Sequence, residues 1–282
     1  MNFATNGLMR TINCPHIAGT LSPKLNDMAN SNKIALVTGG SRGLGKDMAL
    51  NIAKKGLDVV LTYHSKKDEA LAVVNEIEQG GQKAAALQLN AGDVKGFDAF
   101  VADLKTVLSK KFESDKIDFL VNNAGIGLPI PSFAQTTEEN FDELMNIHFK
   151  GVFFLTQKLL PVLNDGGGII NLSSGLTRFS HPGSGAYASM KGAVEVLTRY
   201  LAKELGARGI NVNTVAPGAI ATDFGGGRLR NSPEVQAYIK SITAIPRIGH
   251  AEDIGGVVAF LCTPEAKWVN GQRIEVSGGM YL

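Results

Sequence analysis

The feature that most constrains the fold is a glycine-rich turn between an apolar run and a helical pattern. Residues 33–37 form the apolar run, and the turn at 38–45 reads Thr-Gly-Gly-Ser-Arg-Gly-Leu-Gly. A short apolar run of this kind is typical of a buried parallel strand. Glycines between a strand and a helix let backbone N–H groups approach a pyrophosphate at the helix N-terminus. The segment therefore predicts a dinucleotide site.

Short apolar runs and helical patterns alternate from there to the C-terminus. This alternation predicts an α/β fold: a single Rossmann-type domain whose doubly wound, seven-stranded parallel sheet carries helices on both faces. Strands are expected at 33–37, 58–62, 83–89, 117–121, 168–172, 210–215 and 272–276. Helices are expected after residue 45 and at 67–79, 96–111, 138–160, 187–205, 233–241 and 251–261, with Val194, Leu197, Leu201 and Leu205 as the inner stripe of one of them.

Composition narrows the possible function classes. The 282 residues include 28 basic and 26 acidic side chains without a basic block, which argues against nucleic acid or an anionic membrane as main partner. No apolar run approaches the ~20 residues of a membrane span. The two cysteines, Cys14 and Cys262, lack the spacing of a metal site or a disulfide framework. We therefore expect no metal and a reducing, cytoplasmic compartment.

The N-terminal segment differs from the rest of the chain. Residues 1–30 have little charge, no periodicity and no apolar core of a secretory signal. They predict a disordered extension ahead of a catalytic domain at 31–282. Met28 is an alternative start of translation, and Arg10 and Lys24 are too few cations to favour an organellar leader.

The end of the second strand bears on the choice of dinucleotide. Enzymes that use the unphosphorylated cofactor usually carry an acidic residue there, which holds the ribose 2′-hydroxyl. This chain has Ser65 and Lys66 instead, no acid before Asp68, and Arg42 within reach of the same place. Cations and a hydroxyl suit a 2′-phosphate, so we predict NADP(H) rather than NAD(H). The alternative is that Arg42 and Lys66 are solvated surface charges.

Two further strand ends fit the same cofactor. Asn90 and Ala91 follow the third strand, where an adenine would lie. Asn123, Ala124 and Gly125 follow the fourth strand, where small residues let a ribose and a nicotinamide pass close to the backbone. The alternative for the asparagine is a turn residue that bonds its own main chain.

The stretch around Tyr187 predicts the chemistry. Lys191 follows by four positions, so both side chains share one helix face, and Ser174 ends a strand at the same edge of the sheet. A free tyrosine titrates near pH ~10, and a nearby cation lowers that pKa. The phenol then becomes a usable proton donor and acceptor. The alternative is a strand end, a helix start and a solvated lysine.

The expected helix at 138–160 is apolar around nearly its whole circumference, which predicts burial on both sides. The sheet covers one side, so we expect a second subunit on the other, in a homodimer or homotetramer. Asn146 is a polar exception, either a satisfied core amide or part of a functional network. Thr136 and Glu139 predict a capping box at the helix start.

Residues 223–247 form a looser segment with three consecutive glycines, which predicts a substrate-facing flap with a hinge. Arg178, Arg228 and Arg230 either meet an anionic substrate or are solvated. A largely apolar substrate pocket is expected from Ile130, Leu176, Phe179, His181, Phe224 and Met280.

Six motifs together resemble those of the short-chain dehydrogenase/reductases, in the branch that includes 3-oxoacyl-carrier-protein reductases and general carbonyl reductases. They keep the family's order and spacing and span residues 33–282. The motifs are the turn 38–45, the run 122–125, Asn146, Ser174, the run 187–191 and the pair Pro217-Gly218.

The resemblance implies a role for each residue. Tyr187 would be the general acid that protonates a carbonyl oxygen as hydride arrives, and Ser174 would orient and polarise that carbonyl. Lys191 would lower the tyrosine pKa and hold the nicotinamide ribose, and Asn146 would anchor a water in a proton relay. The expected cofactor contacts, the last two to the carboxamide, are Gly39, Ser41, Arg42, Gly43, Leu44, Gly45, Ser65, Lys66, Asn90, Ala91, Asn123, Ala124, Gly125, Tyr187, Lys191, Pro217, Gly218, Ile220 and Thr222.

The predicted function is reduction of a ketone or aldehyde to an alcohol by NADPH, reversible as an alcohol dehydrogenase. One alternative is a 3-oxoacyl-carrier-protein reductase. Such enzymes tend to carry cations where an acidic carrier docks, and here Arg208 matches one such place while the turn at 164–168 has none. The other alternative is a non-catalytic NADP(H)-binding regulatory protein, a class that usually lacks the tyrosine or lysine retained here.

Overall fold

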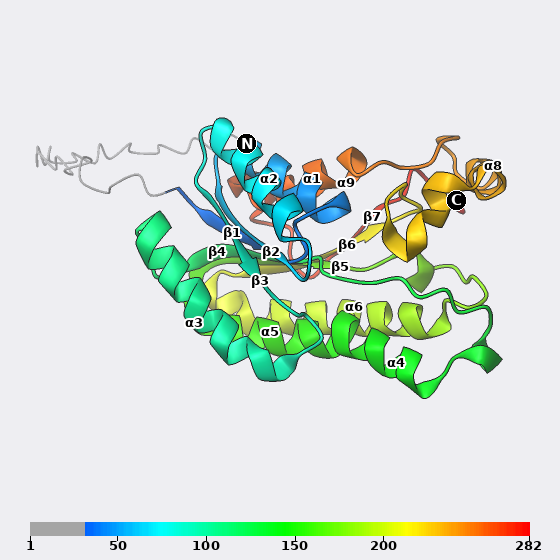
Figure 1. The fold of residues 1–282 in the computed structure, drawn as a ribbon, viewed down its shortest axis with the longest axis horizontal. Helices are drawn as coiled ribbons and strands as arrows, with labels where there is room; N and C mark the ends of the chain where they lie inside the picture. The colour runs from blue at the N-terminus through cyan, green and yellow to red at the C-terminus, as the bar shows by residue number, and fades with distance from the viewer. Residues whose placement is uncertain (1–31) are drawn as a thin grey trace, which may run out of the picture. The chain divides into compact units, whose positions relative to one another are not determined.

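A parallel sheet organises the chain (Figure 1). The computed structural model describes residues 32–282, and the extension expected at 1–30 lies outside them. The strand order is β3-β2-β1-β4-β5-β6-β7, and every neighbouring pair is parallel. The strands are β1 Ile34–Val37, β2 Asp58–Tyr63, β3 Ala84–Gln88, β4 Ile117–Asn122, β5 Leu163–Leu172, β6 Asn211–Pro217 and β7 Arg273–Val276.

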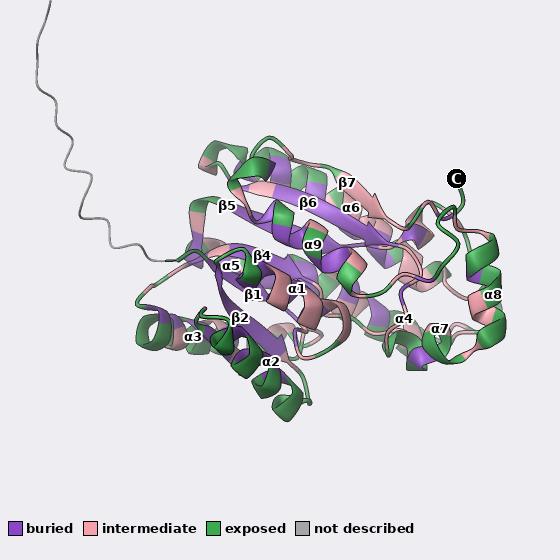
Figure 2. Cartoon of the chain, turned by 90° about the horizontal axis from the view of Figure 1, so that it is seen from above, coloured by how far each residue is buried: buried purple, intermediate pink, exposed green. Residues whose placement is uncertain are grey.

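Helices cover both faces of the sheet, which confirms the predicted fold class. Helices α1, α2 and α9 pack on one face, and α3 to α6 lie on the other (Figure 1). Figure 2 shows the strands buried between helices whose outer sides are exposed. The helices are α1 Gly43–Lys54, α2 Lys67–Gln79, α3 Phe97–Val107, α4 Glu138–Met145, α5 Gly151–Leu159, α6 Gly185–Leu205, α7 Arg228–Asn231, α8 Pro233–Ser241 and α9 Glu252–Leu261.

The strand order reverses at β1, and this places the site. Strand β1 pairs with β2 on one side and with β4 on the other. The chain leaves β1 into α1 on one face and leaves β4 toward α4 on the opposite face. A crevice therefore opens at the carboxyl ends of these two strands, where open α/β sheets bind their ligands.

The expected helix at 138–160 is not one continuous α-helix. Helix α4 ends at Met145, a π-helical turn spans Asn146–Lys150, and α5 begins at Gly151. The expected helix at 96–111 likewise ends in a π turn, Leu108–Phe112. A π turn widens the helix locally and occurs often at functional sites. Apolar periodicity over a long window cannot show such a turn, because it shifts the register only locally.

The predicted capping box is wrong by one residue. Thr137 is the N-cap of α4, and its Oγ1 accepts a hydrogen bond from the backbone N–H of Asn140 at 3.2 Å. The side chain of Thr136 donates instead to the carbonyl of Ser132, 3.4 Å away. The preceding turn thus engages the first threonine and leaves the second to cap the helix.

Strand β5 begins earlier than expected, so the turn expected at 164–168 belongs to the strand. The pairing of β5 with β4 shifts in register between Ile117 and Phe119. Glycine is required at this irregularity, because a Cβ on Gly167 would lie 2.1 Å from the carbonyl oxygen of Asp118. A glycine run of this kind predicts a turn, whereas in the structure it lies within β5 at the irregularity in strand pairing.

The inner stripe of α6 is also displaced from the prediction. Val194 and Leu205 are buried, but Leu197 and Leu201 are only half-buried on the flank. Thr198 takes the central place, where its Oγ1 is 2.9 Å from the Asn171 amide and 2.8 Å from the Thr214 hydroxyl. These buried hydrogen bonds to the sheet turn the threonine inward.

The centre of the sheet should carry much of the stability. Leu120 in β4 is 1% exposed and belongs to the core under α3 and α5. We expect Leu120→Ala to lower the free energy of unfolding by about 2–5 kcal/mol, because it leaves a cavity in a packed core. Urea denaturation gives this value. Leu71→Ala on α2 is the control, since Leu71 is 42% exposed; equal losses at both positions would contradict the assignment of the core.

Candidate active site

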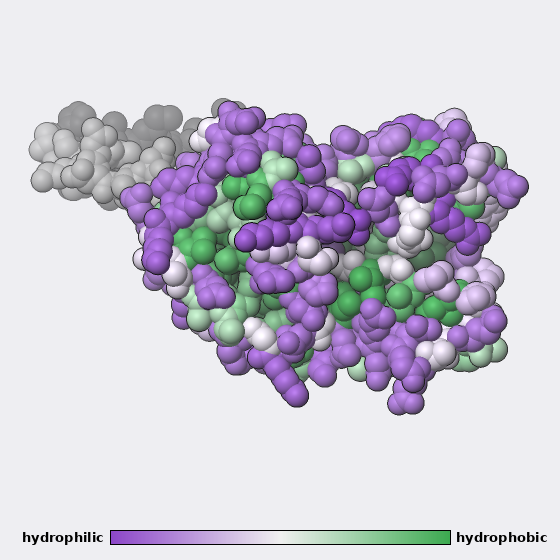
Figure 3. Space-filling view, viewed as in Figure 1, coloured by the Kyte–Doolittle hydropathy of each residue, from purple (hydrophilic) through white to green (hydrophobic). Residues whose placement is uncertain are grey.

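A cleft of about 1740 Å³ opens at the carboxyl edge of the sheet. Figure 3 shows hydrophobic side chains gathered on the surface between α4 and α8. Every residue predicted for catalysis or cofactor contact lies on the wall of this cleft, from the glycine turn to Thr222. Of the residues expected in the substrate pocket, Ile130 is absent from the wall.

The glycine turn has the shape and charge for a pyrophosphate. Gly39 and Gly43 have φ values of 67° and 54°, which favour glycine. A Cβ on Gly45 would lie 2.1 Å from the carbonyl oxygen of Gly39, so the turn packs too tightly for any side chain. Helix α1 starts with no side-chain cap and no acid in its first turn. Its free N–H groups and positive dipole end therefore suit an anion.

Hydrogen bonds tie the β1 turn to the end of β4. Thr38 Oγ1 accepts from the backbone N–H groups of Asn123 and Ala124, at 2.9 and 3.0 Å. The Asn123 amide donates to the carbonyl of Thr38 at 2.8 Å. The asparagine therefore bonds the main chain of the glycine turn rather than its own. Asn122 points the other way and donates to Asn171 and Thr156, at 2.8 and 3.0 Å in the core.

Two cations lie where a 2′-phosphate would bind. Arg42 and Lys66 are exposed on the cleft wall beside Ser65. Arg42 Nη1 is 3.5 Å from Asp223, and Lys66 Nζ is 3.7 Å from Glu69. Exposed pairs of this length contribute little free energy, so both cations can turn toward an anionic ligand.

Ser174, Tyr187 and Lys191 meet at the end of β5. Ser174 follows the strand, and its Oγ accepts from the backbone N–H of Leu176 at 3.2 Å. Tyr187 lies in the first turn of α6, and Lys191 follows one turn later. Lys191 is buried, and its Nζ donates to the carbonyl of Leu172 at 2.7 Å. The same Nζ is 5.8 Å from the centroid of the Tyr187 ring.

Burial dominates the electrostatics of this group. It raises the pKa of Tyr187 to about 12, against a smaller opposing effect of the Ser174 side chain. It lowers the pKa of Lys191 to about 8. The expectation that Lys191 would lower the tyrosine pKa is therefore wrong for the protein alone, because the ammonium donates to the Leu172 carbonyl and burial, the largest effect on the phenol, raises its pKa. The phenol stays protonated at neutral pH and is a proton donor.

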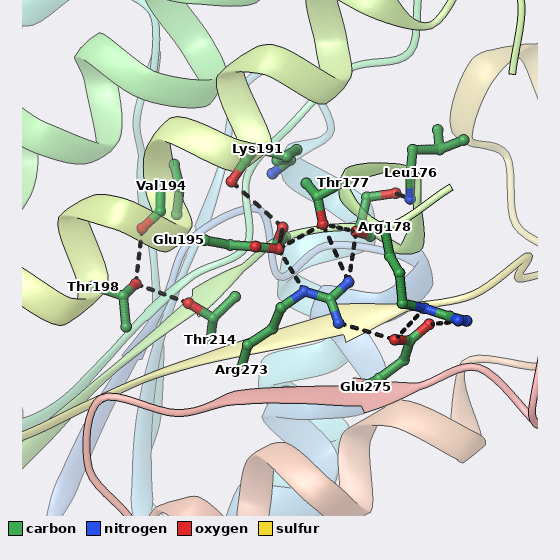
Figure 4. Close-up of polar contacts among 12 residues, drawn as sticks. Leu176, Thr177, Arg178, Lys191, Val194, Glu195, Thr198, Thr214, Arg273 and Glu275 are labelled. Carbon is green, nitrogen blue, oxygen red and sulfur yellow. Dashed lines mark hydrogen bonds and ion pairs between the residues drawn. The ribbon is translucent and has the colours of Figure 1, made fainter. Parts of the chain in front are cut away.

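An ion-pair network supports the turn that carries Ser174 (Figure 4). Arg273 of β7 donates to the Ser174 carbonyl at 3.3 Å and pairs with Glu195 of α6 at 2.8 Å. Glu195 also accepts from the hydroxyls of Ser173 and Thr177, at 2.6 and 2.7 Å. Sequence reasoning missed this network, because its members come from distant segments that meet only once the sheet is formed.

The cations expected near the substrate are mostly engaged within the protein. Arg178 pairs with Glu275 at 2.9 Å and donates to the carbonyls of Met280 and Tyr281. Arg230 pairs with Asp223 at 2.6 Å. Neither arginine lies on the cleft wall, whereas Arg228 does.

His148 is a site residue that sequence reasoning missed. It lies in the π turn, is 1% exposed, and meets the Tyr187 ring edge-on at 5.0 Å between centroids. Burial, followed by the field of Lys191, lowers the pKa of His148 to about 3. Asn146 is half-buried on the cleft wall at the start of the same turn. The only hint in the sequence was a histidine within an apolar helical pattern.

Two kinds of feature are absent from residues 32–282. None of the helices there is long and apolar enough to cross a membrane. Within the same range, no three His, Cys, Asp or Glu side chains are grouped to hold a metal ion.

Known proteins resemble this chain along most of its length. The family model described as enoyl-(acyl carrier protein) reductase matches residues 39–281. A 3-oxoacyl-[acyl-carrier-protein] reductase of Staphylococcus aureus is 39% identical over 252 residues, 89% of this chain and 98% of that protein. An NADPH-dependent aldehyde reductase-like protein of Arabidopsis thaliana is 37% identical over 88% of this chain and 94% of its own length. The solved structure of an angucycline C-6 ketoreductase with bound NADP matches with a TM-score of 0.84 and 36% identity, over 89% and 97% of the two chains.

The depressed pKa of His148 should make stability depend on pH. Between its folded pKa of about 3 and the ordinary 6.5, the unfolded chain binds a proton that the folded chain does not. Stability therefore falls as the pH falls through this window, by roughly 2 kcal/mol between pH 7 and pH 5 for one such group. Urea denaturation should show that His148→Asn removes this part of the pH dependence. The same substitution at exposed His64 should keep it, and a His148→Asn variant with the wild-type slope would refute the neutral buried ring.

Proposed function

The chain belongs to the short-chain dehydrogenase/reductase family, and we propose that it reduces a ketone or aldehyde to an alcohol with NADPH. The observation that carries the proposal is a protonated, half-buried phenol in the same cleft as a dinucleotide cradle. A proton donor beside a hydride source is what carbonyl reduction needs.

Each catalytic side chain has one task in this proposal. The bound dinucleotide supplies a hydride to the carbonyl carbon. The Ser174 hydroxyl donates a hydrogen bond to the carbonyl oxygen and orients it. Tyr187 transfers its proton to that oxygen as the C–H bond forms, which completes the alcohol and leaves a phenolate. The Lys191 ammonium stabilises the phenolate, holds the nicotinamide ribose and is the nearest acid that can return a proton. In the reverse direction, the phenolate would accept the alcohol proton.

NADP(H) is the proposed cofactor. Arg42, Lys66 and Ser65 offer two cations and a hydroxyl after β2, without a carboxylate before Asp68. Charge-assisted hydrogen bonds from these groups suit a 2′-phosphate. The named relatives include an NADPH-dependent reductase and a ketoreductase with bound NADP. The remaining predicted contacts line the same cleft and would hold the pyrophosphate, the adenine and the nicotinamide.

The proposed substrate is an uncharged, hydrophobic ketone or aldehyde. Leu176, Phe179, Phe224 and Met280 give the outer cleft apolar walls. The nearby Arg178 is engaged by Glu275 and by backbone carbonyls. Of the three arginines expected near the substrate, only Arg228 lines the cleft, and a charged substrate would lose its hydration against the apolar walls.

A carrier-bound 3-oxoacyl group is the second candidate, favoured by the 39% identity to the Staphylococcus aureus enzyme. Arg208, the cation at the place expected for an acidic carrier, is engaged within the protein. Arg208 pairs with Asp165 at 2.7 Å and donates to the carbonyls of Leu160 and Leu163, at 3.2 and 2.6 Å. Its guanidinium thus joins the turn before β6 to the segment where β5 begins. Turnover of a carrier-bound acetoacetyl group, compared with that of small ketones, separates the two candidates. A regulatory protein without turnover would bind NADPH and reduce neither.

The flap, the oligomer and the compartment complete the proposal. Residues 223–247 would act as a substrate flap, hinged where Gly225, Gly226 and Gly227 all have positive φ.

Phe141 and Phe153 leave 40% and 38% of their surface exposed on the helical segment expected to bind a second subunit. We propose a homodimer or homotetramer through this face, in a catalytic domain at 31–282. Cys262 is buried and has no disulfide partner among residues 32–282, which is compatible with a cytoplasmic setting.

Removal of the phenol hydroxyl tests the mechanism. We expect Tyr187→Phe to lower kcat for ketone reduction by about 10²- to 10⁴-fold, because the general acid is lost, with little change in the Kd for NADPH. Absorbance at 340 nm gives the rate, and fluorescence titration gives the Kd. Tyr200→Phe is the matched control on the same helix, since Tyr200 is 65% exposed. Wild-type turnover in Tyr187→Phe would overturn the mechanism.

Substitution of Arg42 tests the cofactor. Arg42→Ala should raise the Kd for NADPH by about tenfold, the value of one charge-assisted hydrogen bond, and that for NADH much less. Arg199→Ala, an exposed arginine of α6 outside the cleft, should change neither. Equal losses for both cofactors in Arg42→Ala would mean that the guanidinium does not contact the 2′-phosphate.

A further inference from the structure

His148 occupies a place in the site that the proposed mechanism does not explain. Its ring lies almost perpendicular to that of Tyr187, with an interplanar angle of 88°. The ring is on the cleft wall, next to the segment after β4. A Cβ on Gly125 would come within 2.6 Å of its Cε1 and 3.2 Å of its Nδ1, so glycine makes room for this edge of the imidazole.

The two ring nitrogens have different surroundings. Nε2 is 2.8 Å from the carbonyl oxygen of Ile126 and 3.3 Å from the backbone N–H of the same residue. The carbonyl oxygen is the nearer atom and can only accept, so we assign the ring proton to Nε2 as the donor to this oxygen. Nδ1 is then an acceptor with a free lone pair. It is buried and has no hydrogen-bond partner among residues 32–282.

A buried acceptor without a partner is costly. It lowers stability relative to a satisfied acceptor, and a hydrocarbon side chain would fill the same space without that cost. Packing against Tyr187 therefore does not account for an imidazole. Nδ1 therefore calls for a hydrogen-bond partner that residues 32–282 do not supply.

The catalytic cycle offers such a use. Each turnover leaves a phenolate at Tyr187, and the adjacent Lys191 is 4% exposed with its Nζ turned to the Leu172 carbonyl. A proton from solvent must reach the half-buried phenol and the buried ammonium before the next turnover. His148 borders Tyr187 from the π turn between α4 and α5, and its free lone pair can order solvent there without taking up the proton.

We propose that His148 is a positioning residue whose Nδ1 anchors the solvent path that reprotonates Lys191 and Tyr187. This inference rests on the proposed reductase function and gives His148 the relay role expected of Asn146. Because the ring is only 1% exposed, we expect His148 to affect the renewal of the proton rather than its delivery to substrate. The first turnover uses the proton already on Tyr187, and only later turnovers depend on His148.

Stopped-flow kinetics with the full chain, excess NADPH and an activated ketone tests the proposal. In His148→Leu we expect a burst of NADPH oxidation equal to one turnover per site at the wild-type rate, then a steady state slowed by about tenfold, a barrier of about 1.4 kcal/mol. His148→Asn keeps a neutral acceptor and should restore most of the steady-state rate. His250→Leu, outside the cleft, should behave as wild type.

Two results would overturn the proposal. A first turnover slowed as much as the later ones would mean that His148 only holds Tyr187 in place. Equal steady-state rates in the leucine and asparagine variants would mean that the acceptor is not used. If His148→Leu does not fold, His148→Ala takes its place, with added imidazole expected to restore the steady state and an absence of rescue counting against the proposal. A wild-type protein without any turnover would instead refute the reductase function, and this inference with it.

Discussion

The hydrogen bond from Lys191 to the carbonyl of Leu172 is the contact on which the site depends. It fixes the first turns of α6 against the end of β5 and holds an ammonium almost out of solvent, at 2.7 Å from a single carbonyl. Burial of a cation with so few partners is unfavourable, which is why the pKa of Lys191 falls to about 8. Burial of Lys191 therefore costs free energy, but it places a proton source one helical turn from Tyr187.

The same burial sets the charge states of the neighbours. Tyr187 is held protonated and His148 is held neutral, although both groups border a cation. A site with a loaded proton donor suits the reduction of a carbonyl, whereas oxidation of an alcohol would first require a phenolate. The polar side chains beneath the site are paired by the register of β5 between β4 and β6. The Asn122 amide donates to Asn171, and the Asn171 amide donates to the hydroxyl of Thr198.

Local patterns predicted what depends on local physics. The glycine turn at 38–45, the strand ends and the pairing of Tyr187 with Lys191 follow from spacing, so the sheet and the composition of the cleft could be predicted. The π turn at Asn146–Lys150 could not, because it shifts the helical register only locally and lies beside a close approach of Gly151 to the Ala91 carbonyl, a contact between distant segments. The raised pKa of Tyr187 was also out of reach, since spacing gives the proximity of a cation but not the direction in which it points. The contacts of Arg273, Glu195 and His148 could not be predicted, because they join segments that are distant in the sequence.

The central claim is that a dinucleotide bound at the glycine turn presents its hydride where Tyr187 delivers a proton. Reduction of a prochiral ketone with NADPH deuterated at C4, in separate reactions with each of the two stereoisomers, tests this most directly. We expect NMR of the alcohol to show deuterium at the carbinol carbon with one stereoisomer and not with the other, because the cleft fixes a single face of the nicotinamide. An alcohol free of deuterium in both reactions, or labelled equally in both, would contradict the account.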